Sequence, residues 1–338
     1  MVRKEDFGMT DAIDFVVLWV DDKDPAWQEK KARYTGNDSR EGNSEVRYRD
    51  WETLKYWFRG VEAFAPWVRY VYFVTDDQKP EWLNLDHPKL KWVKHREFIP
   101  GEYLPVFSSH PIEWNLHRIE GLAERFVYFN DDMFLLKETR PEDFFVRGEP
   151  CDFPVIGAIY SCGFFSHLLF NNMELINRHF SLKDSIRKNP WKWIKGQSVS
   201  GLAKLLLYGR KDLVPGMTAH HIPISYRKST YQILWEKELD VIDATCRNRL
   251  RTKADVTPWC IRDWQILSGA FYPKRPIGKL FHTASMAYND DAITYLRKQK
   301  GKVICLNDSE AENDFLLHKS RITEAFEKLL PEKSKFEL

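Results

Sequence analysis

Short apolar runs that alternate with helix-periodic segments constrain the fold of this chain more than any other feature. Residues 13–20 read IDFVVLWV, a nearly continuous run of β-branched and aromatic residues that is typical of a strand buried on both faces. Three further strands are predicted, over residues 69–75, 90–94 and 126–130. Helix-periodic segments at 50–66 and 112–123 lie between them, so we predict an α/β fold with a mostly parallel sheet.

The rest of the chain predicts fewer strands. The Gly-, Asn- and Ser-rich segment 34–44 predicts a loop, and Asp50 after it is a candidate helix N-cap. The basic, Trp-bearing stretch SLKDSIRKNPWKWIKG at 181–196 favours a solvated helix pair over an acceptor-binding or membrane-surface lobe. Residues 301–308 predict a late strand that returns to the sheet, and residues 312–330 predict a helix.

Composition excludes several classes of protein. The 338 residues carry a net charge of only +2, which argues against a nucleic-acid binder. The five cysteines include no CxxC pair, which argues against a disulfide framework and against a zinc site. The chain begins without the apolar run of a signal peptide and contains no stretch of about 18 apolar residues. We therefore expect a soluble cytoplasmic protein without a transmembrane segment.

Acidic and amide residues follow four of the predicted strands. In an α/β sheet, ligands bind beyond the carboxyl ends of the strands. A single Asp there is usually a turn residue, but several at one edge repel one another unless a cation is present. Oxygen ligands suit Mg²⁺ or Mn²⁺ held together with substrate phosphates. The residues concerned are Asp21, Asp22, Asp76, Asp77, Asn130, Asp131, Asp132, Asn307 and Asp308.

Other polar clusters carry little information by themselves. Glu113 and His117 share a helix face, but their spacing alone favours a surface ion pair. The pair His220–His221 is typical of a loop, and the basic run 247–251 is typical of a solvated face. The sequence contains no G-x-S-x-G elbow, Walker A loop or H-E-x-x-H motif.

Four blocks of the sequence together resemble the Stealth family of polysaccharide phosphotransferases. IDFVVLWVDDKDPAW at 13–27 matches the first block, and the long second block covers about 47–145. HHIPISYRK at 220–228 with RLRTKADV at 249–256 resembles the third block, and VICLND at 303–308 the fourth. In the family a glycine usually follows the Asp of the first block, and the second block usually reads Asp-Gly-Gln. This chain has Asp22 and Asp77 at those glycine positions.

The family includes bacterial capsule enzymes and resembles the catalytic part of GlcNAc-1-phosphotransferase. The resemblance implies a Rossmann-like, GT-A-like nucleotide-sugar transferase core with a helical insertion. It implies transfer of a sugar-1-phosphate from a UDP-sugar to a hydroxyl of a polysaccharide or oligosaccharide acceptor, with release of UMP and with Mg²⁺ or Mn²⁺ as cofactor. A peripheral association with a membrane-bound polysaccharide assembly is compatible with it. The expected parts are 10–150 for nucleotide sugar and metal, 151–215 as helical insertion and acceptor lobe, 216–310 as the remaining catalytic core, and 311–338 as a C-terminal helix.

The resemblance also implies roles for individual residues. His221, Glu113, Arg251 and Asp131 are the expected catalytic residues, with His221 as the candidate base and Glu113 as the alternative base or as the group that orients it. A metal would be bound by Asp131, Asp132, Asn307 and Asp308. The expected cofactor-binding residues are Asp14, Asp21, Arg49, Asp50 and Asp255.

Two other functions remain open from the sequence. A metal-dependent glycosyltransferase that releases UDP would use the same strand-end carboxylates. A non-catalytic carbohydrate-binding protein could use the 13 tryptophans as sugar-stacking platforms, but such a protein has no need of an acidic cluster.

Overall fold

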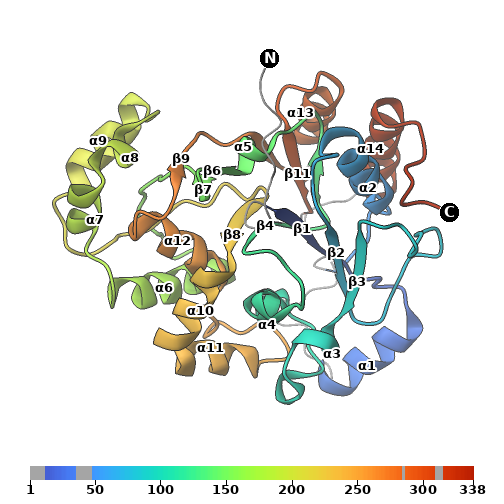
Figure 1. Ribbon diagram of the computed structural model, residues 1–338, viewed down its shortest axis with the longest axis horizontal. Helices are drawn as coiled ribbons and strands as arrows, with labels where there is room; N and C mark the ends of the chain where they lie inside the picture. The colour runs from blue at the N-terminus through green and yellow to red at the C-terminus, as the bar shows by residue number, and fades with distance from the viewer. Residues whose placement is uncertain (1–11, 36–47, 284–285, 309–314) are drawn as a thin grey trace.

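The computed structural model describes residues 12–35, 48–283, 286–308 and 315–338. A five-stranded sheet with the order β3-β2-β1-β4-β8 crosses the middle of the molecule (Figure 1). Strands β1 to β4 are parallel, and β8 runs antiparallel to β4. The order 3-2-1-4 of the four parallel strands is that of the first four strands of the Rossmann order 3-2-1-4-5-6. The strands are β1 (Ile13–Leu18), β2 (Val71–Thr75), β3 (Leu90–Lys94), β4 (Arg125–Phe129) and β8 (Ile224–Arg227).

Two smaller three-stranded sheets flank the main sheet. In one, β11 (Val303–Asn307) pairs with β10 (Gly278–His282) in parallel and with β5 (Met133–Leu135) antiparallel. The other consists of β6 (Phe145–Val146), β7 (Glu149–Asp152) and β9 (Tyr272–Pro273).

Helices account for most of the remaining described chain. The first half contains α1 (Pro25–Thr35), α2 (Leu54–Phe64), α3 (His95–Phe98), α4 (Ser109–Asn115) and α5 (Pro141–Phe144), with 3₁₀ turns η3 (Gly101–Tyr103) and η4 (Leu116–Arg118). The second half contains α6 (Gly163–Asn177), α7 (Leu182–Lys188), α8 (Pro190–Ile194), α9 (Val199–Tyr208), α10 (Lys228–Lys237), α11 (Leu239–Cys246), α12 (Trp259–Leu267), α13 (Met286–Arg297) and α14 (Phe315–Leu329).

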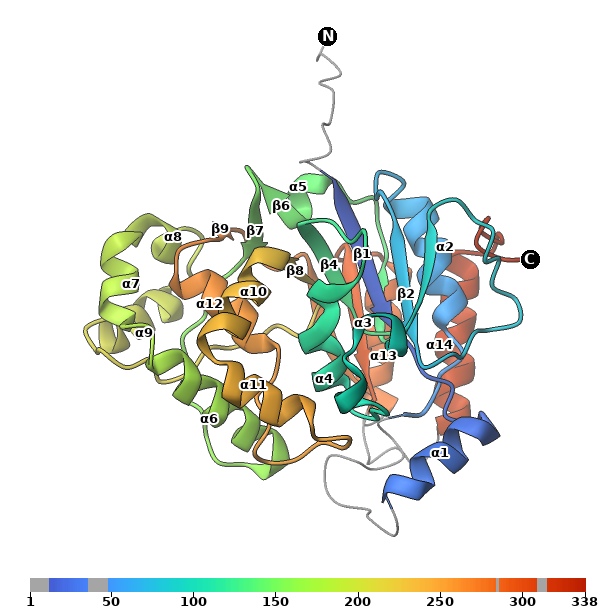
Figure 2. The same cartoon turned by 60° about the horizontal axis from the view of Figure 1, so that its bottom comes forward.

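Both faces of the main sheet are buried, as the apolar strand runs predict. Val16 and Tyr128 point to a core shared with α4, α6, α10 and α12. Phe15 and Phe129 point to the opposite core, shared with α2, α14, β5 and β11. Because successive strand residues face opposite sides, each strand needs apolar residues at nearly every position. Figure 2 shows the helices on the two sides of the sheet.

The predicted α/β class with a mostly parallel sheet is confirmed. The four predicted strands in the first half are β1 to β4, and the predicted helix near residues 50–66 is α2. The stretch 181–196 forms α7 and α8, and the helix predicted at 312–330 contains α14. The four-part division remains a prediction, although α6 of the insertion shares a core with the main sheet. The loop predicted over 34–44 lies mostly outside the described residues.

Three local predictions are wrong. The late strand β11 exists, but it pairs with β10 and β5 and does not join the main sheet. Thr53, and not Asp50, is at the N-cap of α2. The helix predicted to reach residue 123 ends by Arg118. Gly121 follows with a φ of +74°, so the chain turns before β4 instead of continuing as a helix.

The turn between η4 and β4 binds Asp14, which has a structural role. The fully buried Asp14 carboxylate accepts hydrogen bonds from Arg69 Nε at 2.8 Å and from the Ala123 amide at 2.7 Å. Arg69 also donates to the Gly121 carbonyl at 2.8 Å. Asp14 lies in β1 and does not line the pocket described below, so its contacts give it a role in the fold, and its role in cofactor binding stays a prediction.

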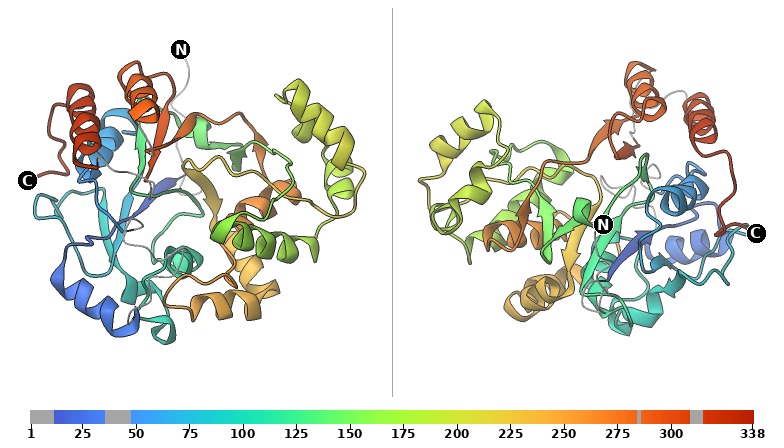
Figure 3. Two further views of the ribbon diagram at one scale, coloured as in Figure 1. Left: turned by 180° about the vertical axis from the view of Figure 1, so that it is seen from behind. Right: turned by 45° about the horizontal axis from the view of Figure 1, so that its top comes forward.

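In the described residues no helix combines the length and the apolar character needed to span a membrane. The helices α7, α8 and α9 lie together at one end of the long axis, and α14 and the C-terminus lie at the other (Figure 3).

We expect Asp14→Ala to lower the free energy of unfolding by about 3 kcal/mol, because it leaves Arg69 and a buried amide without their acceptor. Urea unfolding would measure the loss, and the exposed Asp86→Ala is the matched control. A variant with normal stability but weakened UDP-sugar binding would contradict the structural role.

Candidate functional site

A pocket of about 280 Å³ opens at the carboxyl ends of the parallel strands. The strand-end residues were expected to gather at one site, and this is confirmed in part. Asp21, Asp22 and Asp77 do not line the pocket. Asp77 has a φ of +67° and pairs with Arg96, so an Asp adopts here the left-handed turn that glycine favours. The strand-end residues that line the pocket are Asp76, Asn130, Asp131, Asp132, Asn307 and Asp308.

Backbone hydrogen bonds bring the acidic residues after β4 close to Asn307 and Asp308 at the end of β11. The chain turns tightly after β4, where the Met133 amide donates to the Asn130 carbonyl at 3.2 Å. Strand β11 then runs along the turn, and the Leu306 amide donates to the Asp132 carbonyl at 2.9 Å. This contact joins residues more than 170 positions apart in the sequence. It places Asn307 and Asp308 at the same edge as Asp131 and Asp132.

Burial and mutual repulsion perturb the carboxylates of the pocket. Desolvation, followed by the charges of Asp132 and Asp50, raises the pKa of Asp131 to about 8. Desolvation also raises the pKa values of Asp132 and Asp50 above their ordinary range. One oxygen of Asp132, Oδ1, is buried and has no hydrogen-bond partner within the described part of the chain. These side chains are therefore short of positive charge.

His221 lies beside Asp132 and also lines the pocket. Its Nε2 atom is 3.9 Å from Asp132 Oδ2, and its ring meets Trp259 edge to face with centroids 5.8 Å apart. The backbone of His221 has a φ of +46°, an uncommon value for this residue type. Ligand atoms of Asp132, His221 and Cys305 also lie within 4.8 Å of one another, a grouping that the sequence did not predict.

The donor set fits a divalent cation. A positive ion near Asp131 and Asp132 would remove the repulsion between them and satisfy the unpartnered Oδ1 atom. Carboxylate oxygens match Mg²⁺ or Mn²⁺, and His221 would suit Mn²⁺ better than Mg²⁺. Burial and Asp132 raise the pKa of Cys305, so its thiol is not a ready ligand for a hard cation.

Asp308 differs from the other acidic residues because it has a strong partner. Arg49 forms a bidentate pair with it, through Nε at 2.8 Å and Nη2 at 2.7 Å, and the Trp51 indole donates to it at 3.1 Å. The Asn307 amide faces the His282 ring, with 3.3 Å between the nitrogen atoms. Asp308 and Asn307 thus lie at the pocket as predicted, but Asp308 is already compensated by a guanidinium group.

Glu113 and Arg251 form a second charged group in the pocket. Glu113 lies in α4, and burial raises the pKa of its carboxyl to about 7 against the opposing effects of Ser109, Arg251 and Tyr128. The Arg251 guanidinium donates to Ser109 Oγ at 3.4 Å. Ser109 at the start of α4 therefore contacts both Glu113 and Arg251. The carboxyl of Glu113 can change protonation state near neutral pH.

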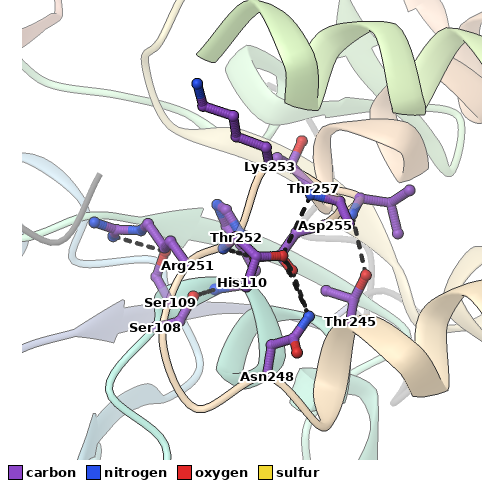
Figure 4. A network of polar contacts seen from close by, with 12 residues as sticks. Ser108, Ser109, His110, Thr245, Asn248, Arg251, Thr252, Lys253, Asp255 and Thr257 are labelled. Atoms are coloured by element: carbon purple, nitrogen blue, oxygen red, sulfur yellow. Dashed lines mark hydrogen bonds and ion pairs between the residues drawn. The ribbon is translucent and has the colours of Figure 1, made fainter. Parts of the chain in front are cut away.

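Asp255 does not line the pocket, and its carboxylate bonds to the loop that carries Arg251 (Figure 4). The carboxylate of Asp255 is buried and accepts from Asn248 at 2.8 Å and from the Thr252 hydroxyl at 2.7 Å and amide at 2.9 Å. Its second oxygen is 3.4 Å from His110 Nδ1 of α4. These bonds fix the loop that carries Arg251 against α4. These contacts give Asp255 a positioning role, since other chain atoms surround its carboxylate, and its predicted cofactor contact stays a prediction.

Asp21 is the third predicted cofactor residue that does not line the pocket. The amide side chain of Gln78 donates to the Asp21 carbonyl at 2.9 Å and accepts from the Asp21 amide at 3.1 Å. Gln78 also donates to Asp24 at 2.9 Å, so it joins the loops after β1 and β2. Asp21 contributes to the pocket through the shape of this loop. Arg49 and Asp50, by contrast, line the pocket as predicted.

Several lining residues were missed by the sequence analysis. Tyr48 donates its hydroxyl to the Phe107 carbonyl at 2.9 Å and packs on Trp27 with ring centroids 5.4 Å apart. Phe165 and Trp259 line the pocket from α6 and α12. The abundance of aromatic residues indicated such a wall in general, but no spacing in the sequence identified which of the 13 tryptophans would lie there.

Two family models match the chain. They are Stealth protein CR1, conserved region 1, over residues 11–39, and Stealth protein CR2, conserved region 2, over residues 47–151. The blocks predicted at 13–27 and 47–145 fall inside these matches.

Similar proteins extend over nearly the whole chain. The receptor polysaccharide phosphotransferase WefC of Streptococcus gordonii is 42% identical, over 98% of this chain and 100% of its own. The capsular polysaccharide phosphotransferase WcwK of Streptococcus pneumoniae is also 42% identical, over 96% of this chain and 99% of its own. Among solved structures, the galactosyltransferase LgtC aligns over 95% of this chain and 98% of its own, with a TM-score of 0.39 and 10% identity.

The raised pKa of Asp131 gives a stability prediction for the metal-free protein. The folded state keeps a proton that the unfolded chain loses between about pH 4 and pH 8, so stability falls as the pH rises through this window. Asp131→Asn removes the repulsion, and we expect it to raise the melting temperature at pH 8 in EDTA by at least about 2 °C.

Mn²⁺ or Mg²⁺ should raise the melting temperature of the wild type and leave that of Asp131→Asn nearly unchanged. The exposed Asp86→Asn is the control for the loss of one charge. Equal stabilisation of both proteins by metal would show that Asp131 is not a ligand.

Proposed function

The chain belongs to the Stealth family of polysaccharide phosphotransferases, and from this premise we propose that it transfers a sugar-1-phosphate from a UDP-sugar to a hydroxyl of a polysaccharide. UMP would leave, and a phosphodiester linkage would form in a capsular or exopolysaccharide. The similar proteins are named as phosphotransferases of receptor and capsular polysaccharides.

One observation carries the proposal. A single pocket is lined by Asp131, whose main charged neighbours are other carboxylates, by a guanidinium group and by a histidine, and these come from separate segments of the chain. Phosphoryl transfer needs alignment of the reactants and neutralisation of charge more than it needs a covalent intermediate. We assign these two tasks to Asp131, Asp132, Arg251 and His221.

The two walls of the pocket support a division between donor and acceptor. Arg49, Asp50 and Tyr48 line it from the segment before α2, and we assign the nucleotide to this wall. Phe165 and Trp259 line it from α6 and α12, and we assign the acceptor sugar to that wall, because an exposed aromatic ring stacks on a sugar face. The assignment follows the expected acceptor lobe at residues 151–215.

Asp131 and Asp132 would hold the divalent cation, with Asn307 nearby. When bound, Mg²⁺ or Mn²⁺ would neutralise charge on the diphosphate of the donor. Asp308 would act through Arg49, which it holds beside the pocket in a bidentate pair. This arrangement leaves Arg49 oriented toward the edge where a phosphate would lie.

Arg251 would bind the phosphate that is transferred. The acceptor oxygen attacks the phosphorus that carries the sugar, a new phosphorus–oxygen bond forms, and the bond to the bridging oxygen of UMP breaks. A guanidinium fork suits the equatorial oxygens of such a phosphate. The Asp255 network holds Arg251 in place, so little reorganisation is needed when the charge develops.

His221 would accept the proton of the attacking hydroxyl. It lies on the acceptor wall beside Trp259 and next to Asp132, which would stabilise the imidazolium ion that forms. Glu113 is the alternative base, and its pKa of about 7 makes it competent for proton transfer near neutral pH. We assign the base to His221 because Glu113 of α4 is buried beside Ser109 of the same helix and Tyr128 of β4.

We place the reaction in the cytoplasm. All five cysteines are free thiols, and three of them, Cys246, Cys260 and Cys305, are fully buried. Unpaired thiols are typical of a reducing compartment.

The reaction is tested by identifying the nucleotide that is released. Purified protein is incubated with a panel of UDP-sugars, Mg²⁺ or Mn²⁺ and an oligosaccharide acceptor, and the products are separated by chromatography. We expect UMP release that requires both acceptor and metal, with phosphorus retained in the product. Release of UDP would overturn the proposal and identify a glycosyltransferase.

The assignment of the base is tested with two variants and a control. His221→Ala should lower kcat by about a hundredfold or more, and added imidazole should restore part of it. Glu113→Gln should lower kcat by less than about tenfold. The control is His220→Ala, because the neighbouring His220 does not line the main pocket.

A larger loss of kcat in Glu113→Gln than in His221→Ala would assign the base to Glu113. In that case the rate of the wild type would rise with pH through about 7, where the Glu113 carboxyl loses its proton, and Glu113→Gln would lose this rise.

A further inference from the structure

Helix α9 exposes an apolar face that no described part of the chain covers. None of its residues is fully buried, and Val199, Leu206 and Leu207 expose 86%, 75% and 65% of their surfaces. Leucine and valine side chains are rarely this exposed together on one short helix. Such a continuous apolar surface indicates a binding function.

The helix has two distinct apolar faces. Leu205 and Tyr208 are partly buried and pack against the core shared with the main sheet. At about 100° per residue, Val199, Leu202 and Leu206 lie together on a different side of the helix. The inner face therefore holds α9 on the body of the protein, while the outer face remains available to a partner.

Neighbouring segments extend the apolar surface. In α8, Trp191 and Ile194 expose 49% and 54% of their surfaces, and Leu213 after α9 exposes 65%. Trp193, which lies between Trp191 and Ile194, is fully buried and anchors α8. Helix α8 lies beside α7 and α9 at one end of the molecule (Figure 3). An indole with one side in solvent is well suited to the interface between water and lipid.

The charge of this end differs from that of the rest of the chain. Residues 181–213 contain eight basic and two acidic residues, a net charge of +6, whereas the whole chain carries +2. The residues outside 181–213 therefore carry a net charge of −4. One acid, Asp184, already pairs with Arg187, and one base, the buried Lys192, pairs with Glu149. The exposed basic residues are Lys183, Arg187, Lys188, Lys195, Lys204, Arg210 and Lys211.

From this combination we propose that α8 and α9 form a docking surface for anionic membrane lipid, with the outer face of α9 buried among the acyl chains near the headgroups. An apolar helix face supplies the insertion, and surrounding basic residues supply the attraction to acidic headgroups. A protein partner with an apolar groove would not require seven exposed cations around it.

The docking surface and one wall of the pocket come from the same part of the chain. Helix α6 precedes α7 in the same part of the chain, and its Phe165 and Leu168 line the pocket. A protein that docks through α8 and α9 would therefore face the membrane with the lobe that carries one wall of its site.

The test is flotation of the full-length protein with lipid vesicles. We expect binding to vesicles of phosphatidylglycerol and phosphatidylcholine in equal parts, and much weaker binding to phosphatidylcholine alone. Raising NaCl from about 0.05 M to about 0.5 M should weaken the binding, because salt screens the basic residues. Equal binding to both kinds of vesicle would overturn the proposed preference for acidic lipid.

The apolar face is tested with a matched pair of variants. Leu206→Glu with Leu207→Glu should reduce the fraction bound by about tenfold, because the carboxylates cannot enter the acyl region. Leu316→Glu with Leu317→Glu changes two exposed leucines of α14, at the other end of the molecule, and should bind like the wild type. Nucleotide release should be normal for both variants when the acceptor is soluble.

Sedimentation velocity without lipid distinguishes the competing explanation. If the wild type forms a dimer that Leu206→Glu with Leu207→Glu converts to a monomer, and neither protein floats with vesicles, then α9 binds a second copy of the chain and the proposal is wrong. A monomeric wild type that floats only with anionic vesicles supports it.

Discussion

The repulsion among half-buried carboxylates after β4 is the constraint on which the arrangement of the site depends. Asp131 and Asp132 follow Asn130 at the end of the strand, and the charges of Asp132 and Asp50 add to the desolvation that raises the pKa of Asp131. The fold keeps them there because backbone hydrogen bonds fix the turn to β5 and β11, independently of the side chains. A site built this way is ready for a cation and for phosphate, since the protein supplies the geometry before the charges are balanced.

Positive charge reaches the same pocket by a different structural route. Arg251 comes from a loop between α11 and α12, and the buried Asp255 fixes that loop by accepting hydrogen bonds from its backbone and side chains. Arg49 is held by Asp308. In each case an acidic residue holds a guanidinium group or its loop in place, so the pocket contains cations as well as the carboxylates of Asp131 and Asp132. A substrate with a charged diphosphate and a neutral hydroxyl requires groups of both kinds.

The strands of the first half could be predicted because a strand buried on both faces needs apolar residues at almost every position, and that pattern is local. The position of β11 could not be predicted in this way. The sequence of Val303–Asn307 suits a strand of either sheet, and its place is determined by pairing with β5, more than 160 residues away in the sequence. The end of the helix containing Glu113 was also missed, because the turn at Gly121 is stabilised by Asp14 and Arg69, which lie far away in the sequence.

The same limit governs the site. Asp14, Asp131, Asp255 and Asp308 are chemically identical in the sequence, and family resemblance assigned all four to cofactor, metal or catalysis. The structure separates them by their partners. Asp14 and Asp255 are surrounded by donors of the protein itself, and Asp308 is paired with Arg49, whereas Asp131 has only other carboxylates as its main charged neighbours. Whether a carboxylate is compensated is decided by tertiary contacts. Charge balance in three dimensions, more than position in a motif, therefore distinguishes residues that build this site from residues free to act in it.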